Sequence, residues 1–374
     1  MSNKEYEYKF DTVKPPEDRV YDDRVMHYYE NHSNEPARPL ILALGKHITD
    51  RVLYKLPWLP KVGKELTVND PEYWGLASIV TDEMAEVALK MKVHKGMKLK
   101  EIMKATGKSA AYLEPLLKKM ANVGLVEFNW ENPEHEKQYM LPMFVPRSAE
   151  FFNMKWDNIC EHPQVANFFE RMTQLPLEAI TPMVPPGGAG IGMHVIPVEK
   201  AISMENQSAD VEHISHWLDK YDGKYAAGPC SCRYSRAMCG EGCADDPEDW
   251  CIGVGDMADY LVETNKGLYI TREKVMEILQ RAEDNGFVHQ ITNIDGENKI
   301  FAICNCQEKV CNALRTSQLF NTPNMSRSAY VAKVEAKDCV ACGKCVEFCP
   351  AGAVKLGQKL CKKDGSAVTY PKQE

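Results

Sequence analysis

The sequence contains no long hydrophobic run and no export signal. Its first fourteen residues are polar and charged, and they lack the apolar stretch of a secretory signal peptide. The longest apolar stretch nearby, residues 39–44, is far shorter than the roughly 20 residues that a membrane-spanning helix requires. The sequence therefore predicts a cytoplasmic protein without a membrane span.

An excess of positive charge is also lacking. The chain has 45 Lys and Arg residues against 53 Asp and Glu residues, and its net charge is −8. This balance argues against a protein whose main task is to bind nucleic acid. A dinucleotide fingerprint is missing too, because Gly188, Gly190 and Gly192 follow two prolines and no strand precedes them. No flavin site, nicotinamide site, catalytic base or nucleophile triad is recognisable, so whether the chain is itself an enzyme stays open.

Cysteine, in contrast, is abundant. The chain has 14 cysteines, and twelve of them lie between Cys230 and Cys349. Tight groups of cysteines in a chain without an export signal indicate metal binding rather than disulfides. So many thiols would suit an anaerobe. Cys160 stands apart from the groups, and we expect it to be a small buried apolar residue.

The last group is a run of four cysteines at spacings of 2, 2 and 3, followed by Pro350: Cys339, Cys342, Cys345 and Cys349. This spacing binds a cubane iron–sulfur cluster, whereas zinc sites commonly use two separated pairs. The run resembles bacterial-type ferredoxins, which implies a [4Fe–4S] cluster held by these four residues. Only one such run is present, so either Cys349 or Cys361 could complete the cluster, or a ligand could come from elsewhere.

A second group lies between residues 230 and 311. A helix capped by Thr271 and two strands, 287–292 and 299–303, separate its two halves. The hairpin is expected to present the later cysteines to the earlier ones. The hypothesis is at least one further [4Fe–4S] cluster, with zinc as the open alternative and Cys239 as a spare, from these residues: Cys230, Cys232, Cys243, Cys251, Cys304, Cys306 and Cys311.

The second group resembles a set of iron–sulfur proteins in which Cys-x-Cys-Arg and Cys-Asn-Cys segments precede a ferredoxin-type segment. The matching positions include Arg233, His289 and Asn305. Arg233 would stabilise negative charge on a cluster, unless it is an ordinary surface arginine. His289 would be a hydrogen-bond donor or a ligand, unless it is a packed strand histidine. The resemblance implies a flavin-containing oxidoreductase as the redox partner, fused or separate.

Residues 76–150 show three helical patterns followed by two strands. Thr81 and Ser109 are expected to cap helices, and Gly124 is expected to end the third helix. This order resembles winged-helix domains, which bind DNA or dock to other proteins. Nine lysines and five acidic residues lie between positions 81 and 125, but no arginine, and Glu114 and Pro115 occupy the third helix. We therefore favour docking over DNA contact.

Together these patterns predict an α+β fold: a winged-helix-like domain, an α+β cysteine-rich domain and a small ferredoxin-like C-terminal segment. The expected function is electron transfer through [4Fe–4S] clusters as a non-catalytic component of an oxidoreductase complex. The alternatives are a redox-sensing winged-helix regulator and a zinc-stabilised scaffold. The expected divisions are an extended wrapping segment (1–75), the winged-helix-like domain (76–150), a helical connector with a Pro/Gly loop (151–225), the iron–sulfur domain (226–330), and the ferredoxin-type segment with a C-terminal linker (331–374).

Overall fold

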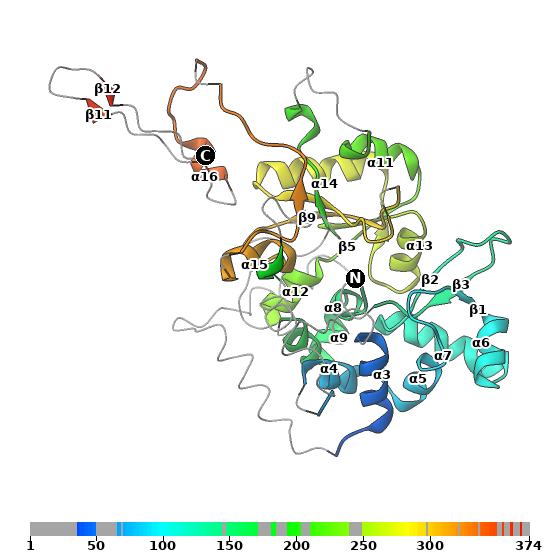
Figure 1. Cartoon of the computed structure of the whole chain (residues 1–374). Helices are drawn as coiled ribbons and strands as arrows, with labels where there is room; N and C mark the ends of the chain where they lie inside the picture. The colour runs from blue at the N-terminus through cyan, green and yellow to red at the C-terminus, as the bar shows by residue number, and fades with distance from the viewer. Residues whose placement is uncertain are drawn as a thin grey trace.

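The computed structural model combines helices and sheets, which confirms the predicted α+β class (Figure 1). It describes residues 36–49, 66–68, 70–143, 147–170, 181–184, 193–202, 210–238, 249–296, 298–320, 322–335, 337–349, 354, 360–361 and 367–368. Among these described residues, no helix has both the length and the apolar composition that a membrane span requires.

The N-terminal part consists of helices around a small antiparallel sheet of order β1-β3-β2. Thr81 caps its helix as expected, because its side chain accepts a hydrogen bond from the Met84 backbone. Gly124 ends the third helix at φ +105°, where a Cβ atom would also meet Phe151 at 2.7 Å. The elements are α3 (Pro39–Thr49), α4 (Pro71–Ile79), α5 (Asp82–Ala88), β1 (Met97–Lys98), α6 (Leu99–Thr106), α7 (Ala110–Val123), β2 (Glu127–Asn129) and β3 (Gln138–Met140).

A seven-stranded sheet of order β10-β4-β8-β9-β6-β5-β7 forms the centre of the C-terminal part. All neighbouring strands are antiparallel except β10 and β4. Cys251 lies opposite Cys304, and Gln290 lies opposite Cys304 on the other side. The strands are β4 (His194–Val195), β5 (Tyr225–Gly228), β6 (Cys251–Val254), β7 (Leu268–Tyr269), β8 (Val288–Ile291), β9 (Ala302–Cys306) and β10 (Arg327–Ser328).

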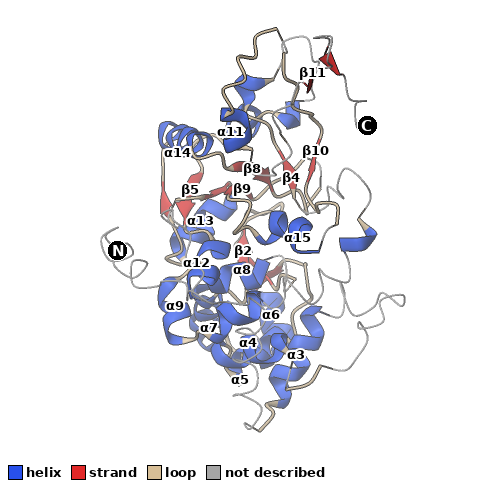
Figure 2. Cartoon of the chain, turned by 90° about the vertical axis from the view of Figure 1, so that its left-hand side faces the viewer, coloured by secondary structure: helices blue, strands red, loops and turns tan. Residues whose placement is uncertain are grey.

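Helices cover both faces of this sheet. Figure 2 shows α11 and α14 on one face and α12 and α13 on the other. The helices are α8 (Ala149–Asn153), α9 (Trp156–Glu161), α11 (Ile214–Lys220), α12 (Ser231–Met238), α13 (Asp256–Glu263), α14 (Arg272–Asp284), α15 (Asn312–Phe320) and α16 (Lys344–Phe348). Shorter elements are η2 (Thr181–Met183), η3 (Glu199–Ala201), η4 (Asp210–Glu212), and the two-stranded pair β11 (Leu360–Cys361) and β12 (Ala367–Val368).

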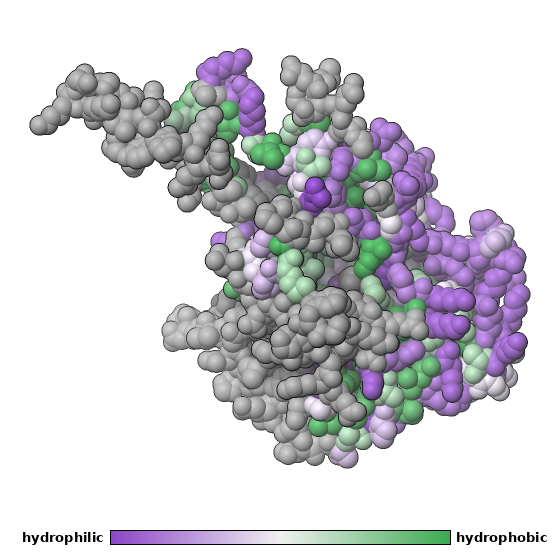
Figure 3. All heavy atoms as spheres, viewed as in Figure 1, coloured by the Kyte–Doolittle hydropathy of each residue, from purple (hydrophilic) through white to green (hydrophobic). Residues whose placement is uncertain are grey.

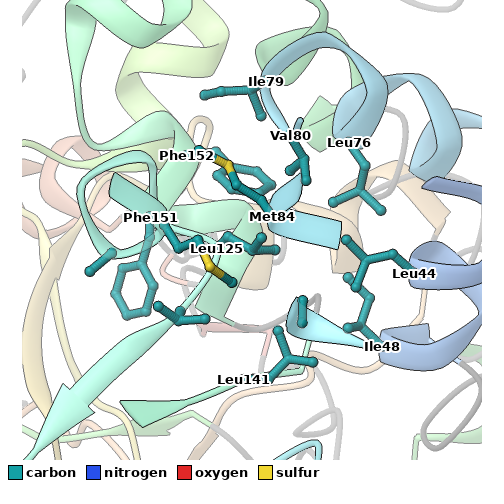
Figure 4. Packing of buried hydrophobic residues seen from close by; sticks show 14 of the residues in the cluster. Leu44, Ile48, Leu76, Ile79, Val80, Met84, Leu125, Leu141, Phe151 and Phe152 are labelled. Carbon is teal, nitrogen blue, oxygen red and sulfur yellow. The ribbon is translucent and has the colours of Figure 1, made fainter. Parts of the chain in front are cut away.

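The largest hydrophobic core runs without a break from α3 to α13. Figure 4 shows Leu44 and Ile48 of α3 pointing toward Leu76 of α4, and all three side chains are fully buried. Within the segment expected to be extended, residues 1–75, α3 is thus a packed helix. This one core connects the helices and strands of the N-terminal part to α13.

One local expectation is wrong, because Cys160 on α9 is exposed rather than buried. On α14, Val275, Ile278, Leu279 and Ala282 are buried, while the side chain of Met276 is 52% exposed. The buried side chains belong to the core between this helix and the sheet.

Ion pairs fasten the β2–β3 hairpin to the cysteine-rich part. The buried Arg147 guanidinium pairs with Glu127 of β2 and with Asp295 of the β8–β9 turn. In the loop between β2 and β3, Glu131 pairs with Lys299, which lies close before β9. Hydrophilic side chains gather on the surface over this region (Figure 3). The hairpin is thus held against the sheet by charge as well as by the shared core.

The carboxyl group of Glu150 gives the fold a pH dependence. Burial raises the pKa of Glu150 to about 6, although the carboxylate accepts the Arg147 backbone N–H at 2.5 Å. The folded state therefore keeps this proton to higher pH than the unfolded state does. Stability from Glu150 is present below about pH 4.5 and is lost as the pH rises through about 6, at a cost on the order of 2 kcal/mol.

Glu150→Gln should remove this pH-dependent loss while keeping an acceptor for the Arg147 N–H. Urea unfolding under anaerobic conditions at several pH values from 4.5 to 7.5 measures the effect. The wild type should lose stability relative to the variant as the pH rises. The exposed Glu161→Gln is the matched control and should follow the wild type. Parallel curves for wild type and Glu150→Gln would contradict the prediction.

Candidate metal centres

Six cysteines from four elements meet at one end of the central sheet. One of them directly precedes α12 and one lies in its first turn, one begins β6, two lie in the second half of β9, and one directly precedes α15. In the two β9 cysteines the side chains point to the same face, since they are two residues apart in a strand. We call these residues the six-thiol group: Cys230, Cys232, Cys251, Cys304, Cys306 and Cys311.

The thiols of this group form a continuous series of neighbours. Cys230 contacts Cys232, and Cys232 contacts Cys311. Cys311 in turn contacts Cys306, which is hydrogen-bonded to Cys304. The series ends at Cys251, the hydrogen-bond partner of Cys304. Residues about seventy positions apart in the sequence therefore form a single site.

The contacts keep the thiols protonated when no cation is present. A hydrogen bond with Cys251, together with burial, raises the pKa of Cys304 well above its ordinary value. A hydrogen bond with Cys304 and burial do the same for Cys306. For Cys232 the hydrogen bond with Cys230 lowers the pKa, but the one with Cys311 and burial outweigh it. Thiolates packed this closely require a compensating positive centre, which a bound metal supplies.

Two helices direct their N-termini at the six-thiol group. In the first turn of α12, the Tyr234 backbone N–H donates to the Cys230 carbonyl at 3.0 Å. In the first turn of α15, the Arg315 backbone N–H donates to the Cys311 carbonyl at 2.9 Å. The Asn312 backbone N–H donates to the Cys232 Sγ at 3.5 Å. Helix N-termini stabilise negative charge, so the local fold favours thiolate ligands here.

Gln290 is a functional candidate that the sequence reasoning missed. Its side chain is fully buried, and its Nε2 donates to the Cys311 Sγ at 3.6 Å. In the register of β8 and β9 it lies opposite Cys304. The alternation of strand residues could have revealed it, because residues paired with cysteines share the cysteine face of the sheet.

For Arg233 and His289 the sequence left two alternatives open, and the structure shows the surroundings of both side chains. Arg233 is not a surface residue: it is 1% exposed, its guanidinium lies over Trp250, and it donates to the Asn305 carbonyl at 3.1 Å. His289 pairs with Asn305, and its Nδ1 lies 2.7 Å from the Asn305 Oδ1. Asn305 points to the face opposite Cys304, so among the described residues His289 faces away from the six-thiol group and is the packed strand histidine of the second alternative.

The six-thiol group offers more thiols than one cluster requires, since a [4Fe–4S] cluster needs four thiolate ligands. Within the ranges that the structure describes, no three or more Cys, His, Asp or Glu side chains have the arrangement of a single metal-ion site. Cys239 and Cys243 lie outside the described residues, so their contribution stays a prediction.

The C-terminal run forms a separate, open site. Figure 1 shows the chain from β10 to α16 extending away from the main body. Cys339, Cys342 and Cys345 are exposed, and Cys349 is half-buried at the end of α16. Gly343 adopts φ +80° between the second and third cysteines, a left-handed conformation that lets the loop turn tightly. The side chain of Cys361 is outside the described part, so the choice of fourth ligand is untested.

A comparison with protein families identifies this segment. Residues 332–355 match the family described as a 4Fe-4S binding domain. Comparisons of the whole chain with curated proteins and with solved structures gave no match. The C-terminal segment is thus a ferredoxin-type segment that binds a [4Fe–4S] cluster, and the chain has an iron–sulfur electron-transfer role.

Proposed function

We propose that this chain relays single electrons between at least two [4Fe–4S] clusters and a flavin-containing oxidoreductase partner. One cluster would be held by Cys339, Cys342, Cys345 and Cys349, and another by four thiols from the second cysteine region. The convergence of the six-thiol group supports this proposal most strongly, because it adds a buried second site to the ferredoxin-type segment.

The two sites differ in exposure, which suits a relay. A [4Fe–4S] cluster supplies reversible one-electron transfer when it is bound. The exposed cysteines of the C-terminal segment suit exchange with a partner. In the six-thiol group, Cys306 and Cys311 are buried and the other four cysteines are half-buried. The chain itself supplies ligands, helix N-termini and N–H donors rather than a catalytic base.

The partner assignment rests on the resemblance of the second cysteine region to segments that serve flavoproteins. We expect the isolated chain to be reduced and reoxidised reversibly by one-electron reagents. It should show no turnover with NAD(P)H until the flavoprotein is added, because we recognise no nicotinamide or flavin site in its sequence. Turnover by the purified chain alone would contradict the proposal.

Metal analysis of protein purified without oxygen tests the proposal directly. We expect about eight or more irons and as many sulfides per chain, with EPR signals after dithionite reduction. A content of about four irons would mean that only the C-terminal segment is loaded. Zinc with little iron would overturn the electron-transfer proposal in favour of a zinc-stabilised scaffold.

A redox-sensing regulator is the second candidate. Lys118 and Lys119 are exposed on α7, the third helix of the winged-helix-like region, and could meet phosphates. The ion pairs of the β2–β3 hairpin count against it, since they hold the hairpin on the sheet. Gel-shift assays with promoter DNA at several salt concentrations distinguish the two. Salt-sensitive binding that cluster oxidation abolishes would favour the regulator.

A further inference from the structure

A series of hydrogen bonds connects α15 with Cys311, the residue that directly precedes this helix. The Asn324 Nδ2 donates to the Leu314 carbonyl of α15 at 3.2 Å. The Asn324 Oδ1 accepts the Ser326 backbone N–H at 2.8 Å. The Ser326 hydroxyl donates to the Gln290 Oε1, and the Gln290 Nε2 donates to the Cys311 Sγ at 3.6 Å. Since Cys311 directly precedes α15, the series forms a ring.

The ring determines which end of the Gln290 amide faces the sulfur. An amide has one acceptor and one donor end, and the Ser326 hydroxyl engages the acceptor. The donor end is then directed at Cys311. Gln290 is fully buried and Ser326 is 5% exposed, so bulk water does not compete for either group.

We propose that Gln290 is a positioning residue that raises the reduction potential of the cluster bound by the six-thiol group, and that Ser326 fixes its orientation. This inference rests on the proposed function. An N–H donor stabilises negative charge on a ligand sulfur, and that charge is greater after one-electron reduction. The donor therefore favours the reduced state.

Substitution of Gln290 tests the inference in the full chain carrying Cys342→Ser and Cys345→Ser, so that a single cluster signal remains. Gln290→Leu removes the donor and keeps an apolar side chain of similar size. An EPR-monitored redox titration should show about a tenfold smaller equilibrium constant for reduction, which corresponds to about 59 mV for one electron. Iron and sulfide contents should equal those of the parent.

Three further variants make the result specific. Gln290→Glu places a carboxylate at the same position and should lower the potential further. Ser326→Ala removes the hydroxyl that orients the Gln290 amide. This variant should lower the reduction potential by less than Gln290→Leu does. Gln280→Leu, the same change at an exposed position of α14, should leave the potential unchanged.

Two outcomes are decisive and separable. Iron in the parent chain together with an unchanged potential in Gln290→Leu, Gln290→Glu and Ser326→Ala would overturn the role of Gln290 alone. Absence of iron from the parent, with iron present in the wild type, would mean that the six-thiol group holds no cluster. That result would overturn the proposed relay, and the role of Gln290 with it.

Discussion

Replacing Cys304 and Cys306 with serine should lower the iron content from about eight to about four per chain. These two thiols connect the members of the six-thiol group, because Cys304 contacts Cys251 and Cys306 contacts Cys311. Without these two thiols, four described members of the group remain. Cys251 then no longer contacts the other three, which are Cys230, Cys232 and Cys311. Iron and sulfide analysis of anaerobically purified protein measures the effect.

The reciprocal substitution and a control define the two sites. Cys342→Ser with Cys345→Ser should remove the other four or so irons and leave the signal of the six-thiol group. Cys160→Ser, at the exposed position on α9, should leave the iron content at the wild-type value. If the β9 double variant retained the full iron content, Cys304 and Cys306 would not be cluster ligands.

Local signals in the sequence predicted the helix ends well. Thr81 and Thr271 both accept a hydrogen bond from the third residue of their helices, because a cap depends only on the residues beside it. The spacing of Cys339 to Cys349 was informative for the same reason, since a single short loop supplies the ligands. Ser109 occupies its expected N-cap position but makes no capping hydrogen bond through its side chain.

Local sequence patterns could not predict which strands pair with one another. The sequence placed Cys304 and Cys306 after a strand, whereas both lie within β9. Their position depends on β6, which pairs with β9 from about fifty residues earlier in the chain. The same pairing brings Gln290 to the thiols and turns His289 away. A shift of the register by one residue would exchange these two side chains, so composition alone could not distinguish them.

Glu170 links the two helices that present cysteines. Its side chain is fully buried, and its carboxylate accepts hydrogen bonds from Arg315 of α15 at 2.7 Å and from Ser235 of α12 at 2.8 Å. Arg236 of α12 lies 3.5 Å away. One buried carboxylate thus contacts both the helix that carries Cys232 and the helix that directly follows Cys311.

Glu170→Gln should destabilise the protein by about 3–5 kcal/mol, since it breaks a buried ion pair with Arg315 by removing one charged partner. Glutamine has nearly the same shape, so the loss would report the charge rather than a cavity. Anaerobic urea unfolding measures the stability, and iron analysis follows the six-thiol group in the same samples. Glu277→Gln is the matched control, because Glu277 forms an exposed pair with Lys274, and such pairs contribute only about 0–1 kcal/mol.

A double-mutant cycle separates the ion pair from the fold around it. Arg315→Met alone leaves the Glu170 charge with Arg236, while Glu170→Gln with Arg315→Met removes one charge of each sign. If the pair is coupled as the geometry indicates, the double variant should lose less stability than the two single variants together. Strictly additive losses would show that Glu170 and Arg315 are not energetically coupled.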